Sequence, residues 1–106
     1  MTKLLSREQV NQYHNFGFVS PVDVLTQDEI KQSINEIENF EEETGHPIDF
    51  PHKSRCHQLF AWADYLVHHP KILDAVEDVI GPNILCYHAT LWVKPGQSNS
   101  FVRWHQ

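Results

Sequence analysis

Positive charge is scarce in this chain. There are 8 Lys and Arg residues against 14 Asp and Glu, so the formal net charge is −6. Proteins that bind nucleic acid need clustered positive charge to displace counterions from phosphates, so we do not expect a nucleic-acid partner. No apolar run approaches the ~20 residues that cross a bilayer, and the first residues turn polar at once. The sequence therefore predicts neither a membrane span nor a signal peptide, and we expect a cytoplasmic protein.

Cysteine is also scarce. The 2 cysteines, Cys56 and Cys86, form no CxxC motif and no zinc-finger spacing, so reduced thiols are predicted. A zinc site made of Cys56, His57, Cys86 and His88 is an alternative, but its spacing is not that of a usual finger. The chain nevertheless has 8 histidines, a high count. Five of them lie in polar or loop contexts where structural roles are expected: His14, His46, His52, His68 and His69.

The hydrophobic fraction of 41% and the charged fraction of 21% are typical of a globular chain. A length of 106 residues suits one small domain or a piece of a larger one. Two capping boxes predict helix starts, one formed by Ser6 with Gln9 and the other by Thr26 with Glu29. The second of these helices is expected to run to about Thr44.

Further helices are predicted over residues 59–67 and from Pro70 to about residue 80. The hydrophobic period then changes to two, which predicts a strand over residues 84–93 and a second over 101–106. The odd positions of the first strand are expected to pack on the helices: Leu85, Tyr87, Ala89, Leu91 and Val93. The predicted fold class is α+β, with N-terminal helices leading into the first strands of a sheet.

Three segments carry a family resemblance. They read GPNILC at 81–86, LWVKPG at 91–96 and FVRWHQ at 101–106. In this order and spacing the chain resembles the phytanoyl-CoA dioxygenase family, and SREQ at 6–9 and PKILD at 70–74 are similar as well. The resemblance implies a double-stranded β-helix (jelly-roll) core. Residues 1–106 would be the N-terminal part of a single such domain, with a helical region at about 6–80 and the first core strands at about 84–106.

The family consists of oxygenases that use Fe(II), 2-oxoglutarate and O₂, and that hydroxylate a small organic or acyl substrate with release of succinate and carbon dioxide. Two histidines and one carboxylate hold the metal, which leaves positions open for the co-substrate. By this resemblance His105 is the first iron ligand, and Thr90, Gln106 and Lys53 contact the co-substrate. Arg55 is an equal candidate for the role of Lys53, and strand phase alone adds His88 and Lys94 as pocket residues.

The family motif continues with an aspartate after Trp104, His105 and Gln106, and here the sequence stops at Gln106. The carboxylate, the second histidine and the basic residue that pairs with 2-oxoglutarate would all follow it. We therefore expect the chain as written to be an inactive, truncated piece of a dioxygenase, and no residue in it is assigned as catalytic.

A different class of function stays open. The chain is alternatively a non-catalytic helical interaction module that keeps only the scaffold of the family, in which case an exposed apolar patch is expected. If the chain is part of a dioxygenase, its expected partner is a small-molecule substrate. Neither the identity of that substrate nor an oligomeric state is indicated by the sequence.

Overall fold

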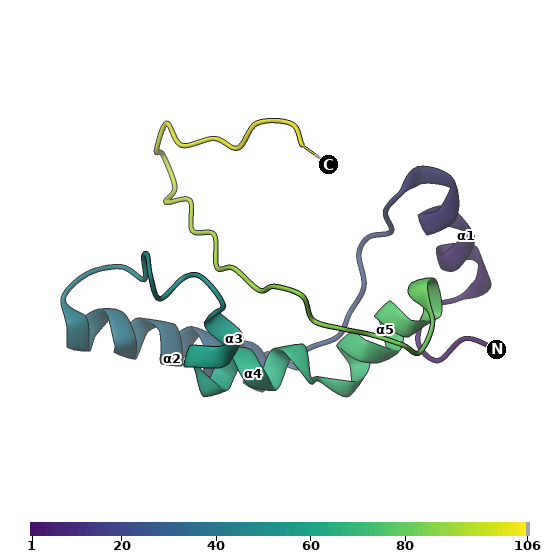
Figure 1. The fold of residues 1–106 in the computed structure, drawn as a ribbon, viewed down its shortest axis with the longest axis horizontal. Helices are drawn as coiled ribbons and strands as arrows, with labels where there is room; N and C mark the ends of the chain where they lie inside the picture. Colours follow the sequence, from purple (N-terminus) through teal and green to yellow (C-terminus); the bar gives the residue numbers. More distant parts are fainter. Residues whose placement is uncertain (106) are drawn as a thin grey trace.

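The computed structural model describes residues 1–105, and within them the chain forms five helices followed by a long extended arm (Figure 1). The arm comprises residues 82–105. Loops of different length separate the helices, and none of the described helices is long and apolar enough to cross a membrane. The helices are α1 (Arg7–Phe16), α2 (Gln27–Thr44), α3 (Cys56–Leu59), α4 (Ala61–Val67) and α5 (Pro70–Ile80).

Both predicted capping boxes are present. The Ser6 hydroxyl accepts a hydrogen bond from the Gln9 N–H, and the Gln9 side chain accepts one from the Ser6 N–H. Thr26 and Glu29 form the same reciprocal pair at the start of α2. Each box satisfies two N–H groups that a helix N-terminus otherwise leaves free, so these starts are set by residues three positions apart.

The prediction of a single helix over residues 59–67 is wrong, because two helices share this range. Phe60 has extended backbone angles and separates α3 from α4, so Leu59 ends one helix and Trp62 belongs to the next. The Phe60 ring lies 5.0 Å from the ring of Phe40 on α2, edge to face, and 5.9 Å from that of Trp62. This packing of Phe60 against a distant helix is a tertiary effect that the local periodicity does not contain.

The helices form an elongated body. Helix α4 packs on α2 and on α5, and α1 packs on α5 (Figure 1). The described chain measures 47 × 29 × 26 Å, with a radius of gyration of 15.9 Å. A compact chain of this length has a radius of about 13 Å. The excess comes from the line of helices and from the arm, which leaves them and bends back (Figure 1).

The core of the described residues is thin. Its buried side chains are Leu5, Ile48, Cys56, Ala63 and His69, and no large side chain of residues 1–105 is completely buried. The apolar stripes of the helices are mostly half-buried. The apolar stripes stay half-buried because a small elongated chain has too little interior to cover them fully.

The predicted α+β fold, with helices leading into the first strands of a jelly-roll core, is wrong for the described chain, because residues 1–105 contain helices and no strand. Residues 84–93 and 101–105 are extended, as the alternating pattern requires, but extension alone does not make a strand. A strand needs a neighbouring segment to accept and donate its backbone hydrogen bonds. The arm has such a neighbour at one place, where Thr90 forms an isolated antiparallel bridge with Ser54.

The prediction that the odd positions pack on the helices is wrong for three of the five. Leu85, Tyr87 and Val93 are 85%, 92% and 54% exposed. Ala89 and Leu91 are half-buried, because they flank the bridge to Ser54. The arm residues that are half-buried are therefore those that contact the loop before α3, and the alternation of side chains does not decide which they are.

Candidate functional site

The arm is held against residues 53–56 by two backbone hydrogen bonds, which flank a bridge between Ser54 and Thr90. The Leu91 N–H donates to the Lys53 carbonyl at 2.9 Å, the Cys56 N–H donates to the Ala89 carbonyl at 3.2 Å, and the bridge joins Ser54 to Thr90. These bonds link residues far apart in the sequence. They bring Lys53 beside the stretch of the arm that carries Thr90.

The ammonium group of Lys53 has two neighbours. Its Nζ lies 3.3 Å from Oδ1 of Asp49 and 5.5 Å from the centre of the Trp92 ring. The Lys53 side chain is 32% exposed, so the ion pair is only partly shielded from water. The cation therefore sits between a carboxylate on its own loop and an aromatic face on the arm, an arrangement that stabilises a positive charge from both sides.

Asp49 keeps its negative charge in this setting. A hydrogen bond from the Phe50 N–H, and then one from Lys53, lower the pKa of the Asp49 carboxyl below its usual value. Both hydrogen bonds are stronger when the Asp49 carboxyl is ionised than when it is neutral. At neutral pH Asp49 consequently offsets the charge of Lys53.

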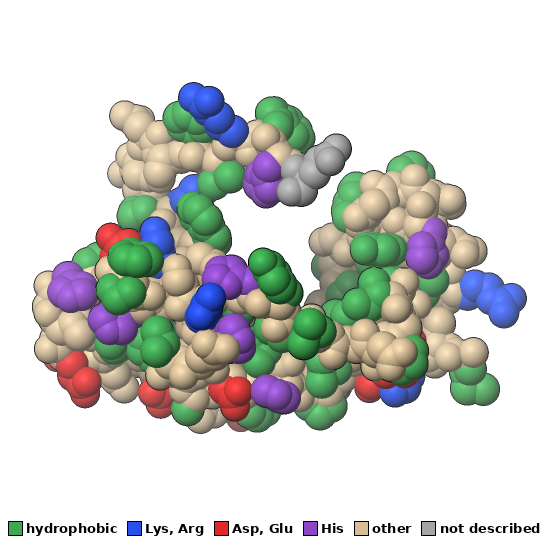
Figure 2. All heavy atoms as spheres, in the orientation of Figure 1, with side chains coloured by type: hydrophobic (Ala, Val, Ile, Leu, Met, Phe, Trp, Pro, Cys, Tyr) green, Lys and Arg blue, Asp and Glu red, His purple; other side chains and the backbone are tan. Residues whose placement is uncertain are grey.

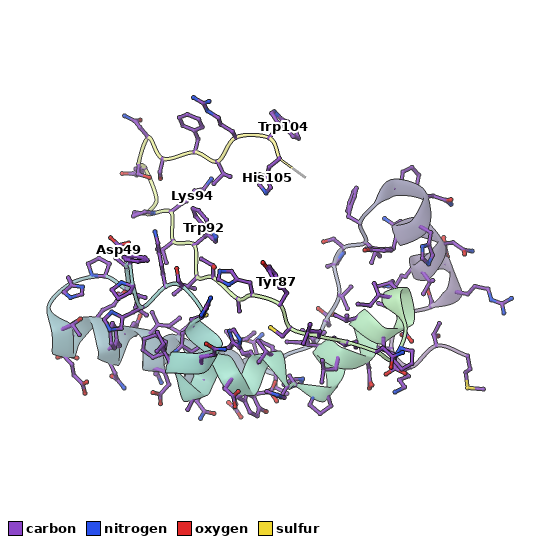
Figure 3. All side chains as sticks on the ribbon, in the orientation of Figure 1. Asp49, Tyr87, Trp92, Lys94, Trp104 and His105 are labelled. Atoms are coloured by element: carbon purple, nitrogen blue, oxygen red, sulfur yellow. The ribbon has the colours of Figure 1, made fainter. Side chains whose placement is uncertain are left out.

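An open cavity of about 630 Å³ lies where this loop faces the arm. Its lining joins loop residues that include Asp49, Phe50 and Lys53 to arm residues that include Trp92, Lys94 and Phe101. Figure 3 shows Trp92 and Lys94 on the inner side of the arm's bend, above the loop that carries Asp49. Thr90 is not among the lining residues. The structure thus brings Lys53 and Lys94 to one cavity and leaves Thr90 beside it.

The other residues assigned to the pocket are spread out. Thr90 is half-buried at the bridge, whereas His88 is exposed, with its ring 6.4 Å from that of Tyr87. Arg55, the alternative to Lys53, is exposed in a left-handed backbone conformation with φ 53° and does not line the cavity. Of these two alternatives, Lys53 lines the cavity and Arg55 does not.

His105, the expected iron ligand, lies on the far part of the arm and is exposed. Its Nδ1 is 2.8 Å from the carbonyl oxygen of Arg103, so Nδ1 donates and Nε2 is the nitrogen with a lone pair for a metal. Figure 3 shows His105 on the inner side of the bend and Trp104 on the outer side. Gln106, the residue assigned beside it, lies outside the described residues.

The described residues do not fit an iron site. Nowhere in residues 1–105 do three His, Cys, Asp or Glu side chains gather as a metal requires. The same finding weighs against the zinc alternative, since Cys56 is buried and Cys86 is exposed. A facial triad needs two histidines and a carboxylate around one ion, and His105 here is a single donor.

One polar cluster was missed by the sequence analysis. Buried His69 places its Nε2 within 3.1 and 3.2 Å of the two Glu29 oxygens, and the Tyr65 hydroxyl donates to Glu29 at 3.2 Å. The cluster joins the starts of α2 and α5 to α4, and we assign it to the fold. No sequence signal points to it, because Glu29 and His69 are distant in the chain. The roles of Asp49, Phe50 and Trp92 at the cavity were missed for the same reason.

Comparison of this chain with protein-family models, with curated proteins and with solved structures found no match in any of the three.

Proposed function

We propose that this chain supplies the N-terminal helices and a co-substrate-binding region of a cytoplasmic non-haem Fe(II)- and 2-oxoglutarate-dependent dioxygenase. Such an enzyme hydroxylates a small organic or acyl substrate and releases succinate and carbon dioxide. The family resemblance of the Trp104–His105–Gln106 motif suggests this class. The observation that supports it best is the backbone pairing that sets Lys53 beside the Thr90 stretch, because the resemblance assigns both residues to 2-oxoglutarate.

The chemistry of these two residues suits a dicarboxylate. A lysine offers a mobile point charge with three donors, and a threonine hydroxyl donates one further hydrogen bond. Lys53 already holds a carboxylate, that of Asp49, in a partly exposed pair. Exposed ion pairs are weak, so a carboxylate of the ligand can take the place of Asp49. Free Cys56 and Cys86 agree with the reducing compartment that the proposal names.

His105 has the role of one iron ligand in this proposal. A single imidazole does not hold Fe(II) usefully, so the proposal expects residues 1–106 alone to be inactive and to bind iron weakly or not at all. The remaining donors would have to come from residues outside 1–105. No step of the reaction is assigned to the described residues beyond binding and orienting the co-substrate.

The test uses a polypeptide that continues past Gln106 through a carboxylate, a second histidine and a basic residue. We expect it to form succinate from 2-oxoglutarate in the presence of Fe(II) and O₂. His105→Ala should lower this rate at least about 100-fold. Mutation of a residue that only hydrogen-bonds to a metal ligand already lowers metal affinity or activity about 10–100-fold. His14→Ala, an exposed histidine on α1, is the matched control and should leave the rate unchanged.

Lys53→Met separates the two cationic candidates in the same assay. It should raise the half-saturating concentration of 2-oxoglutarate, whereas Arg55→Met should not. Failure of the extended polypeptide to form succinate would contradict the proposal. Tight binding of Fe(II) by residues 1–106 unaided would contradict it equally.

One observation favours the second candidate function, a non-catalytic interaction module. The arm exposes large apolar side chains, with Tyr87 at 92% and Trp104 at 104%, and Figure 2 shows such side chains along it. Exposed apolar surface of this kind marks contacts with other molecules. Absence of 2-oxoglutarate binding by the extended polypeptide would favour this function over the oxygenase.

A further inference from the structure

The cavity between the loop before α3 and the arm has the size and walls of a small-molecule site. Its volume of about 630 Å³ lies within the range of roughly 300–1,000 Å³ that ligand pockets occupy. Phe50, Trp92 and Phe101 contribute aromatic side chains to it from three separate stretches of chain. Each of the three is largely exposed, at 75%, 71% and 73%, so a ligand there would cover apolar surface that water now touches.

The charges on the cavity wall are unequal. Lys53 is paired with Asp49 at 3.3 Å, and the lowered pKa of Asp49 keeps that pair neutral in sum. Lys94 also lines the cavity and forms no ion pair with any residue of 1–105. The arm itself has no acidic residue, and Figure 2 shows the acidic side chains along the helices and the loop instead. The lysines and the aspartate of the cavity therefore sum to one uncompensated positive charge.

We propose that this cavity binds a small apolar monocarboxylate. Lys94 holds the carboxylate, and the apolar body lies among Phe50, Trp92 and Phe101. While Asp49 stays paired with Lys53, Lys94 is the lysine of the cavity that is left for a carboxylate. The proposal goes beyond the oxygenase function, because it involves neither Thr90 nor His105, and it holds or fails without that function.

The test uses residues 1–106 and a pair of probes, 4-phenylbutanoate and its neutral amide, 4-phenylbutanamide. Binding is followed by NMR through the indole N–H signals of Trp62, Trp92 and Trp104, assigned with Trp92→Phe. The titration is run at pH 8. We expect the acid to shift the Trp92 signal in a saturable way and to leave the Trp62 signal in place, with the amide binding more weakly.

Lys94→Gln should weaken binding of the acid about three- to fivefold, the upper part of the range of an exposed ion pair, and should leave the amide unchanged. Arg103→Gln is the matched control: it removes one positive charge from the same arm but lies outside the cavity, and should change the affinity less than twofold. Circular dichroism checks that both variants keep their helices. Equal affinity for acid and amide, equal loss in both variants, or no shift of Trp92 in the folded chain would each overturn the proposal.

Discussion

His69 uses both ring nitrogens. Its Nδ1 accepts a hydrogen bond from the Lys71 N–H and so caps the start of α5, which leaves Nε2 as the donor toward Glu29. Only 6% of the residue is exposed. Buried polar groups are costly when they lose their partners, so this one side chain has to satisfy the helix start and the carboxylate at the same time.

We predict that His69→Ala lowers the free energy of unfolding by about 1–3 kcal/mol, from the lost cap and the buried hydrogen bond to Glu29. The neighbouring residue offers a matched control. The side chain of His68 is 73% exposed, so His68→Ala should change stability much less. Urea unfolding followed by helical circular dichroism measures both. Equal destabilisation by the two variants would contradict the role of His69 in capping α5 and connecting it to Glu29 on α2.

Helix α5 also anchors the N-terminal residues. The Asp78 carboxylate accepts hydrogen bonds from the N–H groups of Lys3, Leu4 and Leu5 at 2.7 to 2.8 Å. Partial burial raises the pKa of Asp78, but these three hydrogen bonds outweigh it and leave the pKa below the ordinary value of 3.8. A carboxylate that accepts several N–H groups is held in its charged form.

This lowered pKa makes stability depend on pH in a defined direction. The unfolded chain takes up the Asp78 proton near pH 3.8, at a higher pH than the folded chain does. The stabilisation is therefore complete above that pH and is lost as the pH falls through the folded-state pKa. We predict that Asp78→Asn is less stable at neutral pH and that its stability falls less steeply below pH 3.8.

Unfolding by urea at several pH values between neutral and strongly acid tests this prediction. Asp74→Asn, on the same helix, is the control, because the one polar contact of the Asp74 carboxylate within residues 1–105 is with the Lys3 ammonium group, at 3.8 Å. The control should keep the pH slope of the original chain. A parallel slope in Asp78→Asn and the original chain would contradict the role given to the three N–H groups.

On the scale of the whole molecule, the arm differs from the helices in its backbone bonding. Apart from Leu91, whose N–H donates to Lys53, the N–H groups of residues 85–94 have no backbone acceptor in the described chain. The helices by contrast bond internally along their lengths. Amide hydrogen exchange distinguishes these two states, since exchange is fast where the backbone is bonded only to water.

We predict slow exchange in the middle of α2 and α5 and unprotected exchange in most of the arm, with Leu91 as the exception. Mass spectrometry of peptides after a brief labelling pulse measures this exchange. Overlapping peptides that end on either side of Leu91 show whether its N–H is protected. Protection across residues 92–105 would contradict the prediction.

The starts of α1, α2 and α5 could be read from the sequence because their causes are local. Ser6 with Gln9 and Thr26 with Glu29 are three residues apart, and Pro70 takes the first position of α5 as expected. The break at Phe60 could not be read, because its ring packs on Phe40 across the molecule. At the site, Lys53 and Lys94 were named as binding residues, but their shared cavity depends on how the loop and the arm are folded together.

The sequence by itself determined where α1, α2 and α5 begin and which segments are extended, because capping bonds and alternating side chains act within a few residues. Whether an extended segment became a strand was decided only by the tertiary structure, since the bonds of a strand come from a distant stretch of chain. Here that stretch is the short loop around Ser54, which pairs with Thr90 and with little else. The same contact decides where Lys53 lies, and so where the candidate site is.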